Sequence, residues 1–145
     1  MHLEQKISQS LYQAVREKYE CGLYRDAILA ATFQLQESIR EKANLATEQI
    51  PANPLDSISH LFGVPKPLIQ VNNMNSVAEV YEQMGFEQML LGILQGVQYS
   101  RIHAECFDND KTANAIIVFV DYLITRIQNS QTAHLQKVSE NQQCA

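Results

Sequence analysis

The chain has 145 residues, of which 46% are hydrophobic and 19% charged, and its net charge is −5. These values are typical of one globular domain with a single hydrophobic core. The acidic balance argues against indiscriminate binding to nucleic acid or to an anionic membrane, because neutralising phosphates requires clustered Lys and Arg.

The cysteines and the N-terminal segment predict a cytoplasmic protein. Cys21, Cys106 and Cys144 are odd in number and form no CxxC pair, which argues against a disulfide framework and against a zinc site. The first ten residues, MHLEQKISQS, are polar and amphipathic, unlike a signal peptide. The longest apolar run, residues 115–120, is too short to span a bilayer. No membrane contact is expected.

Apolar residues at helical spacing predict two long helices joined by a tight turn. The first covers residues 3–20, and the second begins near Leu23 and reaches about Leu45. Gly22 lies between them, where it is expected to form a left-handed C-terminal cap. The two helices should therefore form an antiparallel hairpin.

All four prolines fall between Pro51 and Pro67, in the main irregular segment. Within it, NPLDSISHLFG predicts a short helix with Asn53 as N-cap, Pro54 at the first helical position and Gly63 at the end. The following VPKP is expected to be extended, because each proline disfavours helix in the preceding residue. QVNNMNS is expected to be a loop.

The third long helix is predicted to begin near Val77 and to run into QGVQYSRIHAE, residues 95–105. Gly85 is the expected position of a kink. Gly92 and Gly96 lie four residues apart on one face, a spacing that indicates close packing of the helix backbone in a bundle. This helix offers no phosphate-binding face of its own, since residues 67–100 contain no Lys or Arg.

The last long helix is predicted from about Ala113 to Asn129, after a turn at CFDNDKT, with Asp110 or Thr112 as its cap. It is apolar nearly all round, which places it at the centre of a bundle or in a subunit interface. Residues 131–145 are predicted to form a polar tail or a helix extension. Residues 1–130 are thus predicted to be one all-α domain, a bundle of four long helices with a short helix in the proline-rich insert.

The candidate site lies at the end of the third long helix. An imidazole at His103 could exchange protons near neutral pH, although a capping or packing histidine is the alternative. Tyr99, four residues earlier, would share its face and either hydrogen-bond a substrate or pack. On a continuous helix the side chains of Arg101 and His103 would point in different directions, because two residues correspond to a rotation of roughly 200° about the helix axis. The alternative role of Arg101 is a surface pair with Glu105.

The remaining polar patterns predict neither a metal nor a cofactor. The acidic turn DNDK, residues 108–111, lacks the further oxygen ligands and the glycine of a calcium loop, and we interpret it as a capped turn. The chain contains no Glu-x-x-His spacing of a di-iron bundle, no Walker-type glycine loop and no HExxH sequence. His60, in the short helix, is expected at the surface.

The whole pattern resembles the Ymh-like branch of the HEPN superfamily, which comprises small prokaryotic all-helical proteins. The resemblance covers roughly residues 8–128 and rests on LYQAVREKYECGLYRDAILAATFQLQESIREKANL, LDSISHLF, GFEQMLLGILQGVQYSRIHAE and AIIVFVDYLITRI. It implies a HEPN-like helical fold, a homodimer in which two copies of one motif share a cleft, and metal-independent cleavage of RNA. It further implies a role in antiviral defence, abortive infection or a toxin–antitoxin pair.

In such families the third long helix ends in Arg–Asn, a few further residues, and His. The resemblance implies that the histidine assists proton transfer at the 2′-hydroxyl or leaving oxygen and that the arginine stabilises charge on the phosphate. His103 matches the histidine. Gln98 stands at the arginine position, Tyr99 at the asparagine position and Ser100 at the usual following proline. The resemblance therefore implies a degenerate member.

Three functions are compatible with these patterns. The first is a HEPN-like dimer, associated with RNA or defence, that has weak or lost ribonuclease activity and acts through a cleft around His103. The second is an active ribonuclease that uses His103 and Arg101, with Tyr99 as a further candidate; Gln98 is the fourth candidate site residue. The third is a non-catalytic module that binds another protein through its closing helix or tail. The expected partners are a second copy, RNA, or a protein from a defence or toxin–antitoxin system.

Overall fold

The computed structural model describes residues 2–45, 51–105 and 107–133, and these residues are mostly helical. The predicted all-α class is thereby confirmed. The chain divides into two compact units, Met1–Ser38 with Ile93–Thr125 and Ile39–Gly92 with Arg126–Ala145. Two helices, α2 (Tyr24–Ala43) and α6 (Asp110–Gln128), contribute residues to both units. None of the helices in the described ranges is both long enough and apolar enough to cross a bilayer.

The first unit begins with a 3₁₀ turn, η1 (Leu3–Gln5), and then α1 (Gln9–Glu20). The expected single helix over residues 3–20 is wrong at Ser8, where the backbone is extended with ψ of 149°. The Ser8 N–H donates to the Asp121 carboxylate at 3.1 Å, which satisfies one of the donors at the start of α1. Leu3 is still buried, so the apolar periodicity continues although the helix is interrupted at Ser8.

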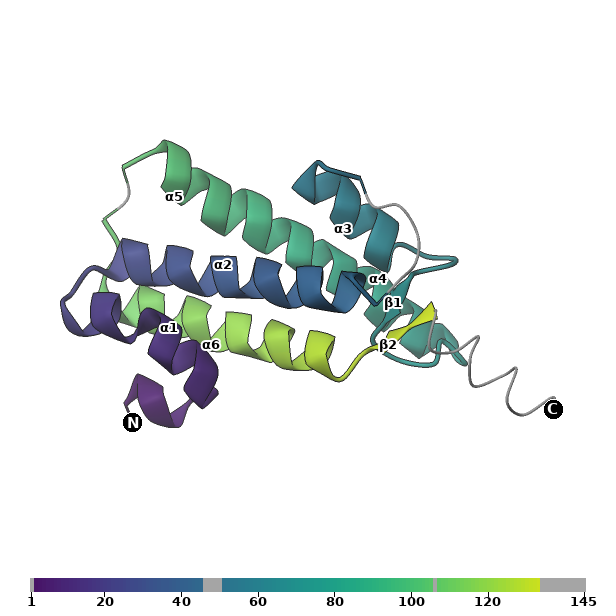
Figure 1. Ribbon diagram of the computed structural model, residues 1–145, viewed down its shortest axis with the longest axis horizontal. Helices are drawn as coiled ribbons and strands as arrows, with labels where there is room; N and C mark the ends of the chain where they lie inside the picture. Colours follow the sequence, from purple (N-terminus) through teal and green to yellow (C-terminus); the bar gives the residue numbers. More distant parts are fainter. Residues whose placement is uncertain (1, 46–50, 106, 134–145) are drawn as a thin grey trace. The chain divides into compact units, whose positions relative to one another are not determined.

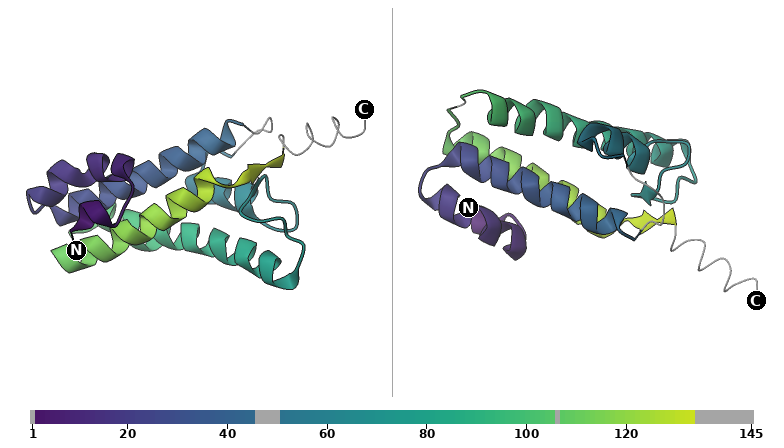
Figure 2. Two further views of the ribbon diagram at one scale, coloured as in Figure 1. Left: turned by 90° about the horizontal axis from the view of Figure 1, so that it is seen from below. Right: turned by 45° about the horizontal axis from the view of Figure 1, so that its top comes forward.

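Gly22 makes the turn between α1 and α2, with φ of +74°. This left-handed conformation is free of strain only without a Cβ atom, so the predicted cap is confirmed. The predicted hairpin is seen in Figures 1 and 2, where α1 and the beginning of α2 run in opposite directions. The buried hydrophobic side chains that these two helices supply to the first unit are Leu11, Val15, Ala27, Ile28, Ala31 and Leu35.

The other helical segments of the first unit are η2 (Ile93–Tyr99), which has π-helical winding, α5 (Ser100–His103), and most of α6. Gly85 lies inside the continuous α-helix α4 (Val77–Gly92), and the winding does not change there. The irregular winding begins instead at Ile93. The core residues that η2 and α6 supply here are Ile93, Leu94, Ala113, Ile117, Val120, Leu123 and Ile124.

Gly92 and Gly96 do not pack closely against any part of the chain that the structure describes. Both are exposed, and a Cβ atom added to either would meet no atom within 4 Å. The expectation that these glycines allow another helix of the same chain to approach is therefore wrong, because their spacing defines a face without saying whether that face is covered.

The short helix of the second unit, α3 (Pro54–Phe62), is formed as the sequence predicts. The Asn53 side chain accepts hydrogen bonds from the N–H groups of Leu55 (2.9 Å) and Asp56 (3.3 Å), and Pro54 occupies the first helical position. The helix ends at Phe62, before Gly63. The buried hydrophobic residues of this unit are Ile39, Ala43, Ile58, Leu61, Phe62, Leu68, Ile69, Phe86, Leu90 and Ile127.

A short antiparallel ladder, which the sequence did not predict, completes the second unit. It pairs β1 (Ile69–Gln70) with β2 (Gln131–Thr132), so Ile69 faces Thr132 in the register. The sequence did not predict these strands because two residues are too few to show the alternating pattern of a strand. In addition, the two paired strands lie far apart in the sequence. The first residues assigned to a polar tail thus pair within the unit, whereas the rest of that predicted tail, 134–145, lies outside the described residues.

Candidate functional site

The sequence-predicted site lies where η2 and α5 end, in the first unit. α5 stops at His103, and Ala104 is extended with φ of −139° and ψ of 153°. The π-helical winding of η2, over Ile93–Tyr99, immediately precedes this end. Short π-helical segments are rare, and they often occur at functional sites. The last turn of this helix, α5, contains no buried residue, and His103 in it is exposed.

Tyr99 and His103 form the exposed part of the site. Their ring centroids lie 4.2 Å apart with 39° between the ring planes, so the predicted shared face is confirmed. His103 is exposed, and Tyr99 is 63% exposed. An accessible imidazole can accept or donate a proton near neutral pH, and the neighbouring phenol can donate a hydrogen bond. This pair could bind a polar ligand or assist proton transfer.

Arg101 forms a buried ion pair with Asp108. Its Nε and Nη2 atoms donate to the two carboxylate oxygens of Asp108 at 2.9 and 2.8 Å, and Nη1 donates to the Val97 carbonyl at 3.2 Å. The side chains of Arg101 and Asp108 are only 12% and 7% exposed. The expected surface pair with Glu105 is therefore wrong. Asp108 neutralises the guanidinium that phosphate chemistry would need.

Arg25 also contacts this helix end and was not singled out from the sequence. Its Nη2 donates to the Arg101 carbonyl, one of the last carbonyls of α5. A cation at the carboxyl end of a helix satisfies a free acceptor and interacts favourably with the helix dipole. No local pattern could reveal this contact, because Arg25 and Arg101 are 76 residues apart.

Gln98, which stands at the motif's arginine position, points away from solvent. Its side chain is buried, and Nε2 donates to the Thr32 hydroxyl and to the Gln36 carbonyl oxygen, both at 3.1 Å. Both partners belong to the part of α2 that lies in the first unit. Gln98 thus satisfies polar groups inside the protein and is not presented beside His103.

The four predicted site residues therefore do not form one constellation. The structure brings Tyr99 and His103 together, turns Gln98 inward, and holds Arg101 against Asp108. The residues that sequence reasoning missed, Arg25 and Asp108, act on this helix end through long-range or loop contacts.

The DNDK turn has the structural role that was predicted for it, since its side chains make contacts within the protein. Asp108 holds Arg101, and the Asn109 side chain accepts a hydrogen bond from the Thr112 N–H at 2.8 Å. Asn109 is therefore the cap of α6, one residue before Asp110 and four residues before the predicted helix start at Ala113. Within the described ranges, no three His, Cys, Asp or Glu side chains are grouped in a way that could hold a metal ion.

The fold and this site define a mostly helical protein with an exposed tyrosine–histidine pair at a helix end. The chain belongs to a family that is described as a protein of unknown function (Hypoth_ymh), whose model matches residues 5–127. No curated protein and no solved structure matches the chain in comparisons of the same kind. Membership of the HEPN superfamily stays a prediction.

Proposed function

We propose that this protein is a HEPN-like homodimer, associated with RNA or antiviral defence, that binds through the surface around His103 and has weak or lost ribonuclease activity. The proposed architecture is a HEPN-like bundle of four long helices with α3 in the proline-rich insert. The mostly helical fold and the position of an exposed histidine at a helix end support this proposal.

The proposal rests on the fact that both candidate phosphate-binding residues, Gln98 and Arg101, are already hydrogen-bonded inside the protein. Gln98 is uncharged, buried and hydrogen-bonded to α2, while all three guanidinium nitrogens of Arg101 are hydrogen-bonded inside the protein. Cleavage of RNA requires stabilisation of charge that develops on the phosphate in the transition state. His103 and Tyr99 can still bind RNA and exchange protons, but they do not supply that positive charge.

The test compares cleavage and binding of total cellular RNA by purified variants. The proteins are the native chain, His103→Ala, Gln98→Arg and Asp108→Asn, with His60→Ala as the control because His60 is an exposed histidine in the second unit. We expect the native chain to bind RNA with little or no cleavage, and His103→Ala to weaken binding. Asp108→Asn, which removes the charge that neutralises Arg101, should raise cleavage, whereas Gln98→Arg should not, because position 98 faces α2 and is not presented beside His103.

Two results would contradict the proposal. If the native chain cleaves RNA efficiently and His103→Ala alone abolishes this at an unchanged melting temperature, the protein is an active ribonuclease. If the native chain neither binds nor cleaves RNA, an RNA-associated role is excluded. Melting temperatures of all variants are measured alongside, because substitution of a buried Gln98 or Asp108 also lowers stability.

A protein-interaction module is the second candidate, and the outer face of α6 favours it. Phe119 and Tyr122 are both exposed, and their rings stack with centroids 6.3 Å apart and 19° between the planes. Exposed aromatic pairs are common at protein interfaces. The salt dependence of RNA affinity separates the two candidates, since each phosphate contact contributes about 0.7–0.9 to the logarithmic slope. A flat slope would favour a protein partner.

A further inference from the structure

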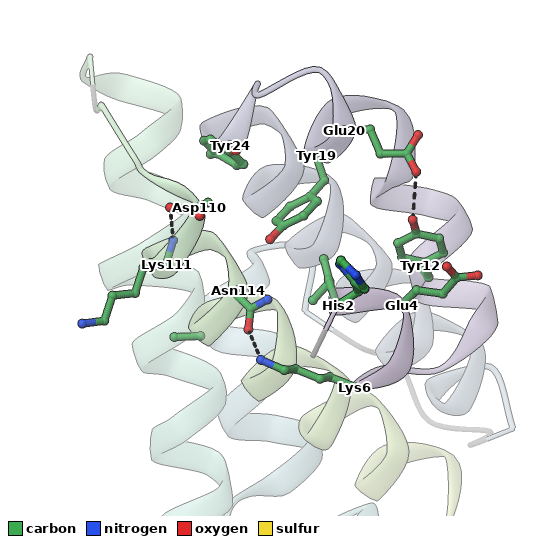
Figure 3. Close-up of a pocket in the computed structure, with 12 residues that line it drawn as sticks. His2, Glu4, Lys6, Tyr12, Tyr19, Glu20, Tyr24, Asp110, Lys111 and Asn114 are labelled. Atoms are coloured by element: carbon green, nitrogen blue, oxygen red, sulfur yellow. Dashed lines mark hydrogen bonds between the residues drawn. The ribbon is translucent and has the colours of Figure 1, made fainter.

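The pocket in Figure 3 does not select one class of ligand. It lies in the first unit, has a volume of about 860 Å³, and is lined by Glu4, Glu20 and Asp110 as well as by Lys6 and Lys111. Since groups of both charges line it, its electrostatics favour neither a cation nor an anion. A groove in the second unit, in contrast, has a mainly apolar lining.

This apolar groove lies along the first two turns of α4. Its volume is about 580 Å³, and its apolar lining residues are Met74, Val77, Val80, Tyr81 and Met84. Three of them are largely in contact with water, since Val77, Tyr81 and Met84 are 73%, 66% and 40% exposed. Removing apolar surface from water is favourable, and neighbouring exposed apolar side chains often mark a surface that another segment covers.

The polar groups beside the groove are already engaged within the protein. The Ser76 hydroxyl accepts from the Glu79 N–H at 3.2 Å, and the Glu79 carboxylate accepts from the Asn75 N–H at 2.8 Å. The Glu82 carboxylate accepts from Arg126 Nη2 at 2.9 Å. These groups therefore offer little to a charged ligand, and an apolar occupant fits the groove best.

The chain leaves β2 close to this groove. The Ala133 N–H donates to the Leu68 carbonyl at 3.0 Å, which fixes the last described residue beside the strand β1. The strand β1 is in turn bonded to α4, because Gln83 in the second turn of that helix donates to the Ile69 carbonyl at 3.0 Å. The segment 134–145 therefore begins in the same unit as the groove and next to the strand that α4 contacts.

The segment 134–145, HLQKVSENQQCA, contains two large apolar residues, Leu135 and Val138. They follow Ala133 by two and five residues, so an extended chain carries them up to roughly 7 Å and roughly 17 Å from that anchor. A segment that is tethered so near a groove has a high effective concentration there, and it occupies the groove in preference to a separate molecule.

We propose that the segment after β2 covers this groove, with Leu135 and Val138 packed against Val77, Tyr81 and Met84. The contact joins the end of the chain to the beginning of α4 and removes the exposed apolar surface of that helix from water. Since the groove and the segment both belong to the second unit, the proposal is independent of the function proposed for His103.

Limited digestion of the full chain with trypsin, followed by mass spectrometry, tests the proposal. Lys137 lies between Leu135 and Val138, so a covered groove protects the peptide bond after Lys137. Tyr81→Ser and Leu135→Ser should each raise the rate of cleavage there by about fivefold or more, because cleavage follows the population of the open form. Tyr122→Ser, the same substitution at an exposed tyrosine of the first unit, is the matched control and should leave the rate unchanged.

The double variant identifies the contact. If Leu135 packs on Tyr81, Tyr81→Ser and Leu135→Ser together should raise the rate no further than either substitution alone, because both remove the same interaction. The proposal is overturned if Tyr81→Ser changes the rate no more than Tyr122→Ser does, or if the two effects simply multiply. It is also overturned if protection of the native chain is lost on dilution, which would identify a second copy as the occupant. Val77→Ser replaces Tyr81→Ser if that variant fails to fold.

Discussion

Gln83 is a buried polar residue that connects three segments of the second unit. Its Oε1 accepts from the Val71 N–H at 2.9 Å, and its Nε2 donates to the carbonyls of Phe62 (2.9 Å) and Ile69 (3.0 Å). One amide side chain thereby satisfies the end of α3, the strand β1 and the residue after it. The residue is completely buried, so no solvent can replace these bonds.

We predict that Gln83→Leu is strongly destabilising. The substitution leaves two backbone carbonyls and one N–H without partners, and each such loss costs about 1–3 kcal/mol. Chemical denaturation should therefore show a decrease of at least about 3 kcal/mol in the free energy of unfolding. Gln88→Leu, at an exposed position of the same helix, is the control. Equal effects of the two substitutions would show that the hydrogen bonds of Gln83 are unimportant.

Tyr12 should ionise at unusually high pH. Its hydrogen bond to Glu20 raises the pKa of the hydroxyl above the ordinary value for tyrosine, with partial desolvation and the charge of Glu20 adding to the effect. Because the folded state holds this proton more tightly, the resulting stability is complete below the unfolded-state pKa. It is lost as pH rises through the folded-state pKa.

The measurement is an alkaline titration followed by the ultraviolet absorbance of tyrosinate. The transition at highest pH should disappear in Tyr12→Phe and move to lower pH in Glu20→Gln, in which the charge is removed. Tyr81→Phe, an exposed tyrosine of α4, should leave that transition in place. If Tyr12→Phe leaves it unchanged, the assignment to Tyr12 is wrong.

At the scale of elements, two glycines that look alike in sequence have opposite roles. A Cβ atom at Gly63, just after α3, would lie 2.4 Å from the Ser59 carbonyl oxygen, which belongs to the backbone and cannot move away freely. A Cβ atom at Gly85, inside α4, would meet nothing within 4 Å. The first glycine is required by close approach, while the second only weakens a helix.

We predict that Gly63→Ala and Gly85→Ala shift stability in opposite directions. Gly63→Ala should lower the free energy of unfolding by about 1–3 kcal/mol through overpacking. Gly85→Ala should raise it by about 1 kcal/mol, because alanine is the better helix former. Thermal and denaturant unfolding measure both. A loss of stability in Gly85→Ala would reveal a contact at that face, such as one with a second copy of the chain.

At the scale of the whole molecule, the exposed apolar residues near His103 bear on the proposed dimer. Phe107 is 97% exposed, and Tyr99 and Ile102 are exposed nearby in the chain. Apolar side chains grouped at a surface often mark an interface. The proposed homodimer would cover them and would bring two copies of His103 to one site.

Sedimentation analysis at micromolar concentration tests this prediction. The native chain should have twice the mass of the 16.5-kDa monomer, and Phe107→Ser should shift the equilibrium toward monomer. Phe33→Ser, at an exposed phenylalanine of α2, should remain dimeric and serves as the control. A monomeric native chain would exclude a site built from two subunits.

The helices could be predicted because their information is local. The cap at Asn53, the left-handed Gly22 and the shared face of Tyr99 and His103 each depend on residues within a few positions of one another. The break before α1 could not be predicted, since Asp121, which accepts from the Ser8 N–H, lies 113 residues away. The strands β1 and β2 escaped prediction for the same reason.

By itself, the sequence determined the helical class, the approximate extent of the helices and the position of His103 at a helix end. Hydrophobic periodicity and capping residues suffice for these, because both act within one or two helical turns. Only the tertiary structure decided which polar side chains are available for chemistry. Gln98 is turned toward α2 and Arg101 is neutralised by Asp108, and such choices depend on packing and on partners that no local spacing identifies.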